Sequence, residues 1–505
     1  MTMTALQAMR NWRKITGEKY FPDITEKVRI ETVFAIVFSM SMLLGNVSLQ
    51  ASEKITTSQD QKSITVTIYN ENLALIKDSR NVELSQNINQ LAWREVSALI
   101  HPETALLRNQ TSQSGFHVFE QNFDFDLLTP QKLLEKHVGK EITVVRTNLA
   151  TGTETNETAV VLSTNEGIVL KFNNRIETGA PGRMVFPGVP ENLRDKPTLL
   201  LLLHSPESGK HELELSYLTG GLSWRADYVA VLSENDNKLD LNGLVTLTNQ
   251  SGVAYPQARL QLVAGDVNQI QSEQRIGRKM TAMSVEMADA AQMKEESLFE
   301  YHLYTLQRPT TLAENQTKQV ALMSASQIPV NKIFFLQGAD YYYSGKYGVL
   351  GQKLKISVLI SFDNKGEQLG IPLPKGIVRV YKKDMQGYSQ FIGEDQIDHT
   401  PKNEQIKLKL GSVFDITADK IQTDFQQIAG SIHQTSIFET AYQITIRNAK
   451  KESVVVQVQE PIPGDWVIVS ESIKHKKISA NTVEWKIPVS AEGEATFIYR
   501  VRVKY

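Results

Sequence analysis

Residues 212–268 constrain the fold of this chain more than any other stretch of the sequence. Apolar residues stand at alternate positions in four runs, and Gly, Asn, Asp or Pro residues bound each run. The runs cover residues 213–217, 228–232, 239–247 and 260–263. Successive side chains of a strand point to opposite faces of a sheet, so this pattern predicts half-buried antiparallel strands joined by turns.

The same alternation recurs before and after this stretch, for example in residues 63–68 and 355–362. After residue 431, strand-like runs follow one another at intervals of roughly 10–15 residues, and we expect Trp466 and Trp485 to anchor their core. We therefore expect an all-β protein with several β-sandwich or barrel modules. The last of these modules is expected to be an immunoglobulin-like sandwich.

One short segment has the features of a helix. Thr129 is a good N-cap, Pro130 suits the first helical position and Gly139 terminates the segment. These residues predict a short helix near residues 130–138.

A second segment, residues 277–298, is rich in methionine and has no Gly or Pro after its start. Met280, Met283 and Met287 fall at helical spacing, but the apolar stripe is narrow and its flanks are long and polar. The segment is therefore expected to be a partly helical or disordered part of a mobile insertion.

The length of 505 residues predicts about three to four folding units. We expect an N-terminal β module over residues 52–195, because prolines at 187 and 190 indicate a connector near its end. A central β-sheet domain should follow over residues 196–430, interrupted by the mobile insertion at 268–311. The immunoglobulin-like sandwich then covers residues 431–505.

Residues 1–51 have the organisation of a secretory signal peptide. Basic residues precede the apolar run 33–44, and Ala51 offers a small residue before the cleavage point. The run is shorter than the roughly 20 residues of a transmembrane helix. The alternative is an uncleaved N-terminal anchor, which would be the chain's only membrane contact. Either reading predicts an extracytoplasmic protein, periplasmic or secreted.

Composition excludes several classes of function. The net charge of −2 gives no electrostatic reason to expect nucleic acid binding. The absence of cysteine excludes disulfides, thiolate zinc sites, iron–sulfur clusters and cysteine nucleophiles. No cofactor or metal motif is present, and we expect none to be bound.

The densest group of potential ligands or acid/base residues includes Glu394, Asp395 and His399. Carboxylates and an imidazole this close could bind a divalent cation or form a catalytic pair. Their spacing matches no metal motif, and the alternative is an ordinary polar turn between two strands.

A second candidate site is the tyrosine run Tyr341, Tyr342 and Tyr343 on a Gly-flanked turn. An exposed aromatic patch on a secreted sheet protein would suit stacking against a glycan or a partner. The alternative is that these tyrosines belong to a strand and pack inward.

Several blocks in this chain resemble a known family. They are LSYLTGGLSWRADYVAVL, LTNQSG, RPTTL and PLPKGIVRVYKKD followed by FIGEDQIDHTPKNEQIKLKLGSVFD. The chain is similar over residues 69–505 to secreted proteins with the domain of unknown function 4139 (DUF4139), also found in proteins related to mucoidy inhibitors. The resemblance implies an extracytoplasmic bacterial β-protein and carries over no catalytic residue.

Two classes of function remain open. The first is a non-enzymatic protein of the cell envelope that binds a partner protein or a glycan, or has a structural role. The second is a metal-dependent or acid/base hydrolase of an envelope glycan or peptide, which would use Glu394, Asp395 and His399 with Asp266 as a further carboxylate. The all-β organisation favours the first class.

Overall fold

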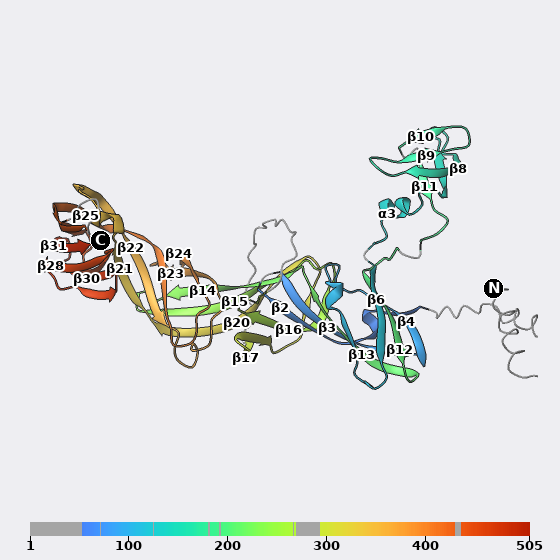
Figure 1. The fold of residues 1–505 in the computed structure, drawn as a ribbon, viewed down its shortest axis with the longest axis horizontal. Coiled ribbons are helices and arrows are strands. Elements are labelled where there is room, and N and C mark those ends of the chain that lie inside the picture. Colours follow the sequence, from blue (N-terminus) through green and yellow to red (C-terminus); the bar gives the residue numbers. More distant parts are fainter. Residues whose placement is uncertain are drawn as a thin grey trace, which may run out of the picture. The chain divides into compact units, whose positions relative to one another are not determined.

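The computed structural model describes residues 53–70, 72–124, 126–179, 182–190, 193–265, 267–268, 293–429 and 436–505. These residues form β-strands almost throughout (Figure 1), so the predicted all-β fold is confirmed. The predicted leader or anchor and Asp266 lie outside the described residues. Among the described residues, no helix has the length and apolar character needed to cross a bilayer.

Four strands form an N-terminal sheet in the order β1-β4-β12-β6. They are β1 (Lys54–Thr56), β4 (Asn87–Arg94), β12 (Thr198–Ser205) and β6 (His117–Asp124). β12 pairs with a neighbour on each side and buries Leu199, Leu201 and Leu203 on one face. An apolar run of this length is therefore a strand of the core sheet. Two short 3-10 turns, η1 (Ser58–Asp60) and η2 (Pro102–Thr104), lie near these strands in the sequence.

A small module is inserted between β6 and β12, which pair with each other at Asp124 and Thr198. It contains the helix α3 (Pro130–Glu135) and a sheet in the order β10-β9-β8-β7-β11. The strands are β7 (Glu141–Thr147), β8 (Glu154–Ser163), β9 (Val169–Lys171), β10 (Ile176–Thr178) and β11 (Arg183–Val185). Thr129 Oγ1 accepts a hydrogen bond from Lys132 N and Pro130 starts the helix, as predicted. The module has its own core, which includes Leu134, Val144 and Phe172.

The long sheet has the strand order β17-β18-β16-β2-β3-β13-β5, and β19 also pairs with β16. Its strands are β2 (Gln61–Tyr69), β3 (Leu73–Leu84), β5 (Leu106–Asn109), β13 (Gly209–Thr219), β16 (Tyr255–Ala264), β17 (Met293–Leu298), β18 (Tyr301–Leu306) and β19 (Thr310–Leu312). Alternating residues of β13, such as Leu213, Leu215 and Tyr217, are buried as the sequence predicts.

The end of the Met-rich segment differs from its prediction. A helical or disordered segment is expected through residue 298, but Met293–Leu298 forms β17 and pairs with β18. Met293 and Leu306 are buried and face each other in the register, so burial in a sheet decides the conformation of this end. Residues 277–292 lie outside the described residues.

The central sheet has the order β20-β15-β14-β23-β24. Its strands are β14 (Leu222–Leu232), β15 (Lys238–Asn249), β20 (Gln316–Pro329), β23 (Gly376–Lys383) and β24 (Ser389–Ile397). β14 and β15 form an antiparallel pair, whereas β14 and β23 run parallel, with Ala226 beside Gly376. A Cβ at residue 376 would overlap the carbonyl of Ala226, so this close approach requires glycine.

The C-terminal sheet has nine strands in the order β28-β31-β26-β25-β22-β21-β27-β30-β29. They are β21 (Asn331–Gln337), β22 (Val349–Asp363), β25 (Gln405–Ala429), β26 (Ile437–Asn448), β27 (Val454–Pro461), β28 (Asp465–Glu471), β29 (Lys476–Ser479), β30 (Thr482–Val489) and β31 (Gly493–Lys504). Strands on both sides of residue 431 therefore belong to one sheet. Trp485 of β30 packs on Phe497 and Tyr499 of β31, although these strands lie near opposite ends of the sheet order. The sheet therefore folds back on itself around an aromatic core, and we call this folded sheet the C-terminal sandwich. Trp485 is fully buried and Trp466 is partly buried against that core.

Two large clusters of buried side chains stabilise these sheets. One joins residues of the N-terminal, long and central sheets, including Trp93, Leu215 and Tyr228. The other fills the C-terminal sandwich and includes Trp485. Both clusters consist mainly of Leu, Ile and Val at alternating strand positions, which is why the sequence pattern alone identifies the fold class.

Candidate functional site

The candidate site lies on the central sheet, at the block Trp224-Arg225-Ala226-Asp227-Tyr228 of β14. The strand period of two sends Trp224, Ala226 and Tyr228 into the core. Arg225 and Asp227 project from the opposite face of the same strand. The apolar residues of the block thus anchor β14 in the core, and its two charged residues form part of the site.

Asp227 is the centre of a set of side chains from neighbouring strands. Thr246 Oγ1 on β15 donates to Asp227 Oδ2 at 2.6 Å, and Arg225 Nε donates to the same oxygen at 3.1 Å. Arg379 on β23 donates from Nη1 to Asp227 Oδ1 at 3.0 Å. Arg379 Nε also lies 3.2 Å from Glu394 Oε2 on β24. We call Arg225, Asp227, Thr246, Arg379 and Glu394 the arginine–carboxylate ladder.

The ladder is buried at its centre and exposed at its ends. The Asp227 side chain is 4% exposed, whereas those of Arg225 and Glu394 are 52% and 51% exposed. Burial alone would raise the pKa of Asp227. The hydrogen bonds from Thr246 and Arg379, with the positive charge of Arg225, outweigh burial and hold the pKa of that carboxyl below its ordinary range.

This geometry suits recognition better than proton transfer. Both oxygens of Asp227 already accept hydrogen bonds, and its lowered pKa keeps it ionised at neutral pH. A general acid or base at neutral pH needs a pKa near the working pH. Asp227 instead fixes two guanidinium groups in place, and Arg225 and Glu394 remain accessible to a partner.

The structure separates the sequence-predicted residues Glu394, Asp395 and His399. Glu394 belongs to the ladder, while Asp395 accepts hydrogen bonds from the backbone N–H groups of Gln396 and Lys409. His399 Nδ1 accepts a hydrogen bond from the Lys375 N–H at 3.3 Å. Neighbouring residues of a strand point to opposite faces, so Glu394 and Asp395 do not converge. Across the described ranges, no three His, Asp or Glu side chains are grouped so as to hold a metal ion.

The three tyrosines singled out from the sequence differ in their exposure to solvent. They form the 3-10 turn η3 (Asp340–Tyr343), in which Tyr341 is half exposed and packs edge-on against Tyr342 and Tyr347. Tyr342 and Tyr343 are buried in the C-terminal core. The expected three-tyrosine surface is therefore corrected to an exposed Tyr341, because the turn directs the other two rings inward.

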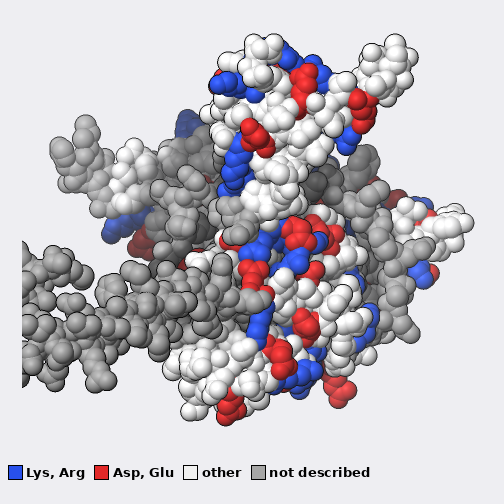
Figure 2. Space-filling view, turned by 90° about the vertical axis from the view of Figure 1, so that its right-hand side faces the viewer, with Lys and Arg blue, Asp and Glu red and all other residues white. Residues whose placement is uncertain are grey.

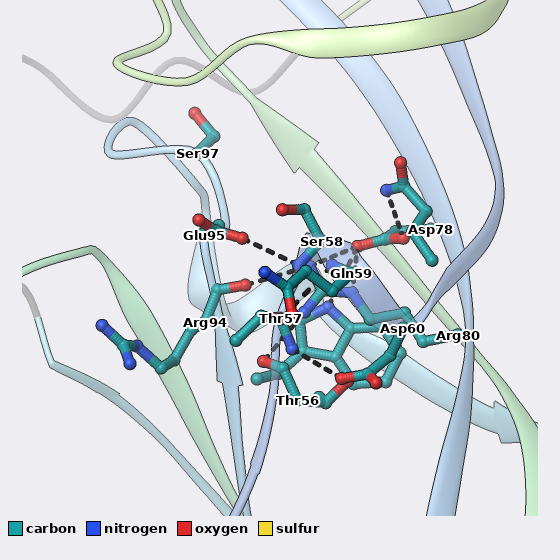
Figure 3. A network of polar contacts seen from close by, with 12 residues as sticks. Thr56, Thr57, Ser58, Gln59, Asp60, Asp78, Arg80, Arg94, Glu95 and Ser97 are labelled. Carbon is teal, nitrogen blue, oxygen red and sulfur yellow. Dashed lines mark hydrogen bonds and ion pairs between the residues drawn. The ribbon is translucent and has the colours of Figure 1, made fainter.

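Sequence reasoning missed a buried polar network in the N-terminal part of the protein (Figure 3). Arg80 donates from Nε to Asp78, from Nη1 to the Thr56 carbonyl and from Nη2 to the Arg94 carbonyl. Asp78 also accepts from Trp93 Nε1, and the Arg80 guanidinium lies 4.6 Å from the centre of the Trp93 ring. We call this the Arg80–Asp78 pair. Buried residues alternate along β3, and this alternation places Arg80 on the core-facing side of the strand. The sequence pattern could therefore have identified Arg80 as a buried residue.

Comparison with known proteins identifies the family. A family model described as a domain of unknown function (DUF4139) matches residues 213–505, more than half of the chain. The matched region begins in β13 and contains the central sheet, the arginine–carboxylate ladder and the C-terminal sandwich. No curated protein matches the chain. The protein therefore belongs to the DUF4139 family.

Proposed function

We propose that this protein is a non-enzymatic, extracytoplasmic protein of the bacterial cell envelope, and that the ladder face of the central sheet binds a partner protein or glycan. The observation that carries the proposal is the ladder itself. A buried carboxylate fixes two arginines, one of them half exposed, beside an exposed glutamate. Fixed guanidinium groups recognise carboxylates and other oxygen acceptors with defined geometry.

Two further features support this proposal. Residues 1–51 have the basic flank, apolar run and small-residue exit of a secretory leader. On the face drawn in Figure 2, basic and acidic side chains lie interspersed, and neither sign forms one broad area. Interspersed charge does not favour a polyanion such as nucleic acid. The hydrolase alternative has no comparable support, because Glu394, Asp395 and His399 each contact different partners.

Site-specific photo-crosslinking in intact cells tests the proposal. A photoreactive residue replaces Arg225 on the ladder face, and a matched variant carries it at Asn235 in the exposed turn after β14. We expect an adduct from position 225 in the envelope fraction, absent from position 235. Sensitivity of the adduct to protease or to glycan-degrading enzymes then distinguishes a protein from a glycan.

Two results would contradict the proposal. One is recovery of the chain in the cytoplasm with residues 1–51 intact. The other is an envelope-located protein that gives the same adducts from both positions. A further variant, Glu394→Ala, should reduce the specific adduct because it removes the carboxylate that contacts Arg379.

A further inference from the structure

A lysine and a glutamate contact each other inside the C-terminal sandwich. Lys420 Nζ lies 2.6 Å from Glu460 Oε1, and the two side chains are 2% and 1% exposed. Lys420 is on β25 and Glu460 on β27, and two other strands separate β25 from β27 in the sheet order. Their contact therefore joins parts of the sheet that are not hydrogen-bonded neighbours.

Aromatic rings enclose the amine. Its Nζ lies 4.2, 4.9 and 5.8 Å from the ring centres of Tyr342, Tyr442 and Tyr499. These rings attract a cation through their faces, but they do not accept the strong hydrogen bonds that water would supply to an ammonium group.

The carboxyl group is held equally closely. Tyr343 donates its hydroxyl to Glu460 Oε2 at 3.0 Å, and the Tyr499 hydroxyl lies 2.8 Å from that of Tyr343. A Cβ at Gly338 would overlap Glu460 Oε2, so the site has room for the carboxyl only because residue 338 is glycine. The amine and the carboxyl group are thus fixed in contact and shielded from solvent.

This environment disfavours the charged form of the Lys420 amine. Burial lowers the pKa of the Lys420 ammonium, and the charge of Glu460 offsets that effect in part. Proton transfer from the ammonium to the carboxylate gives an amine and a carboxylic acid, which removes the cost of two buried charges. A neutral amine is a nucleophile, and a neutral acid is an acceptor for it.

We propose that Lys420 and Glu460 condense to form an intramolecular amide bond that cross-links β25 to β27. Lys420 Nζ attacks Glu460 Cδ, and the bond from Cδ to Oε1 breaks. Oε1 leaves as water with the carboxyl hydrogen and one hydrogen of the amine, and Oε2 becomes the amide oxygen. The Tyr343 hydroxyl donates to Oε2 and stabilises the negative charge that develops there.

The reaction needs no oxidant, reductant or co-reactant, because amine plus acid balance amide plus water. Fixed contact between the reacting groups supplies the proximity that drives such intramolecular steps. The chain has no cysteine and hence no disulfide. The amide would therefore give the C-terminal sandwich a covalent cross-link that does not depend on cysteine.

Mass spectrometry of the purified full-length chain tests the cross-link. After the N-terminus is determined, we expect an intact mass lower than that of the sequence by one water molecule. Trypsin should fail to cleave after Lys420, and the peptide containing Lys420 should be found joined to the peptide containing Glu460. An intact mass equal to the sequence mass, with cleavage after Lys420 and separate peptides, would overturn the proposal.

Two variants complete the test. Lys420→Arg keeps the positive charge but removes the primary amine, so it should abolish the mass loss and the joined peptide. Lys62→Arg alters the exposed pair Lys62–Glu212, whose charged atoms are also in contact, and should leave the cross-link unchanged. If Lys420→Arg does not fold, the wild-type peptide map still decides between the two outcomes.

Discussion

The Arg80–Asp78 and Lys420–Glu460 pairs are both buried, but the protein compensates their charges differently. Arg80 donates to a carboxylate and to two backbone carbonyls, and Asp78 accepts from three side chains. Lys420 has one hydrogen-bond acceptor among the described residues, Glu460, and otherwise faces tyrosine rings.

This difference shows that burial alone does not decide what an ion pair does. A guanidinium whose N–H groups are matched by acceptors remains charged and connects three chain segments. An ammonium with one acceptor retains an uncompensated desolvation cost, which proton transfer can relieve. The first arrangement is structural, and the second is chemically reactive.

The largest effect should come from breaking the Arg80–Asp78 pair. Arg80→Ala leaves Asp78 buried without its cation and the carbonyls of Thr56 and Arg94 without their donor. We expect a loss of about 3–5 kcal/mol in the free energy of unfolding, measured by urea denaturation with circular dichroism. Lys62→Ala, at the exposed pair with Glu212, should cost no more than about 1 kcal/mol. Equal costs for the two variants would show that burial does not govern these pairs.

A smaller effect should come from crowding the Lys420–Glu460 pair without changing its charge. Gly338→Ala places a methyl group against the Glu460 carboxyl, and we expect a loss of about 1–3 kcal/mol. The cross-linked fraction in peptide maps should fall at the same time. The control is Gly348→Ala, where the added methyl group has no neighbour within 4 Å and the cost should stay within about 0.5 kcal/mol. Full cross-linking in Gly338→Ala would contradict the need for tight placement.

The smallest effect should come from the partly exposed arginine–carboxylate ladder. Asp227→Asn removes a charged acceptor of hydrogen bonds from Thr246 and Arg379 and should cost about 1.5 kcal/mol at neutral pH. Because the folded-state pKa of Asp227 lies below its ordinary value of about 3.9, its stabilisation is present above that value. The stabilisation is lost as the pH falls through the folded-state pKa.

The wild-type and Asp227→Asn proteins should therefore converge in stability as the pH falls below about 4, measured by denaturation at a series of pH values. Glu394→Gln, at the exposed end of the ladder, should cost less than about 1 kcal/mol. A difference between wild type and Asp227→Asn that stays constant with pH would show that Asp227 does not stabilise the fold as an ionised group.

The sequence predicts the strands of this protein better than their partners. The four runs between residues 212 and 268 fall within β13, β14, β15 and β16, because alternation depends only on one buried face per strand. The parallel pairing of β14 with β23 was not predicted, since about 150 residues lie between partners such as Ala226 and Gly376. Nothing in a local pattern specifies which distant strand completes a sheet.

The ladder and the buried pairs show the same limit for sites. Glu394 was singled out for its acidic neighbours, yet its partner Arg379 comes from an adjacent strand. Lys420 lies among residues that read as an ordinary polar strand face, and its burial depends on rings from Tyr342, Tyr442 and Tyr499. Burial of a charged residue is a property of the assembled sandwich.

Three asparagines have a buried role that the sequence pattern does not show. Asn249, Asn364 and Asn448 are buried near the ends of β15, β22 and β26, where each side-chain amide donates to backbone carbonyls of the next turn. An amide can donate and accept at once, and each of these side chains also accepts a hydrogen bond from a nearby backbone N–H group. Composition alone marks Asn as a surface turn residue.

The insertion of the small module between two paired strands has a consequence for engineering. Asp124 and Thr198 are cross-strand neighbours, and Leu127 bridges to Arg194 just beyond them. The entry and exit of the module are therefore adjacent, and its core is separate from those of the other sheets. We therefore expect that a short hairpin turn can replace the module without changing the register of the N-terminal sheet. A foreign domain whose termini are adjacent should be tolerated at the same position.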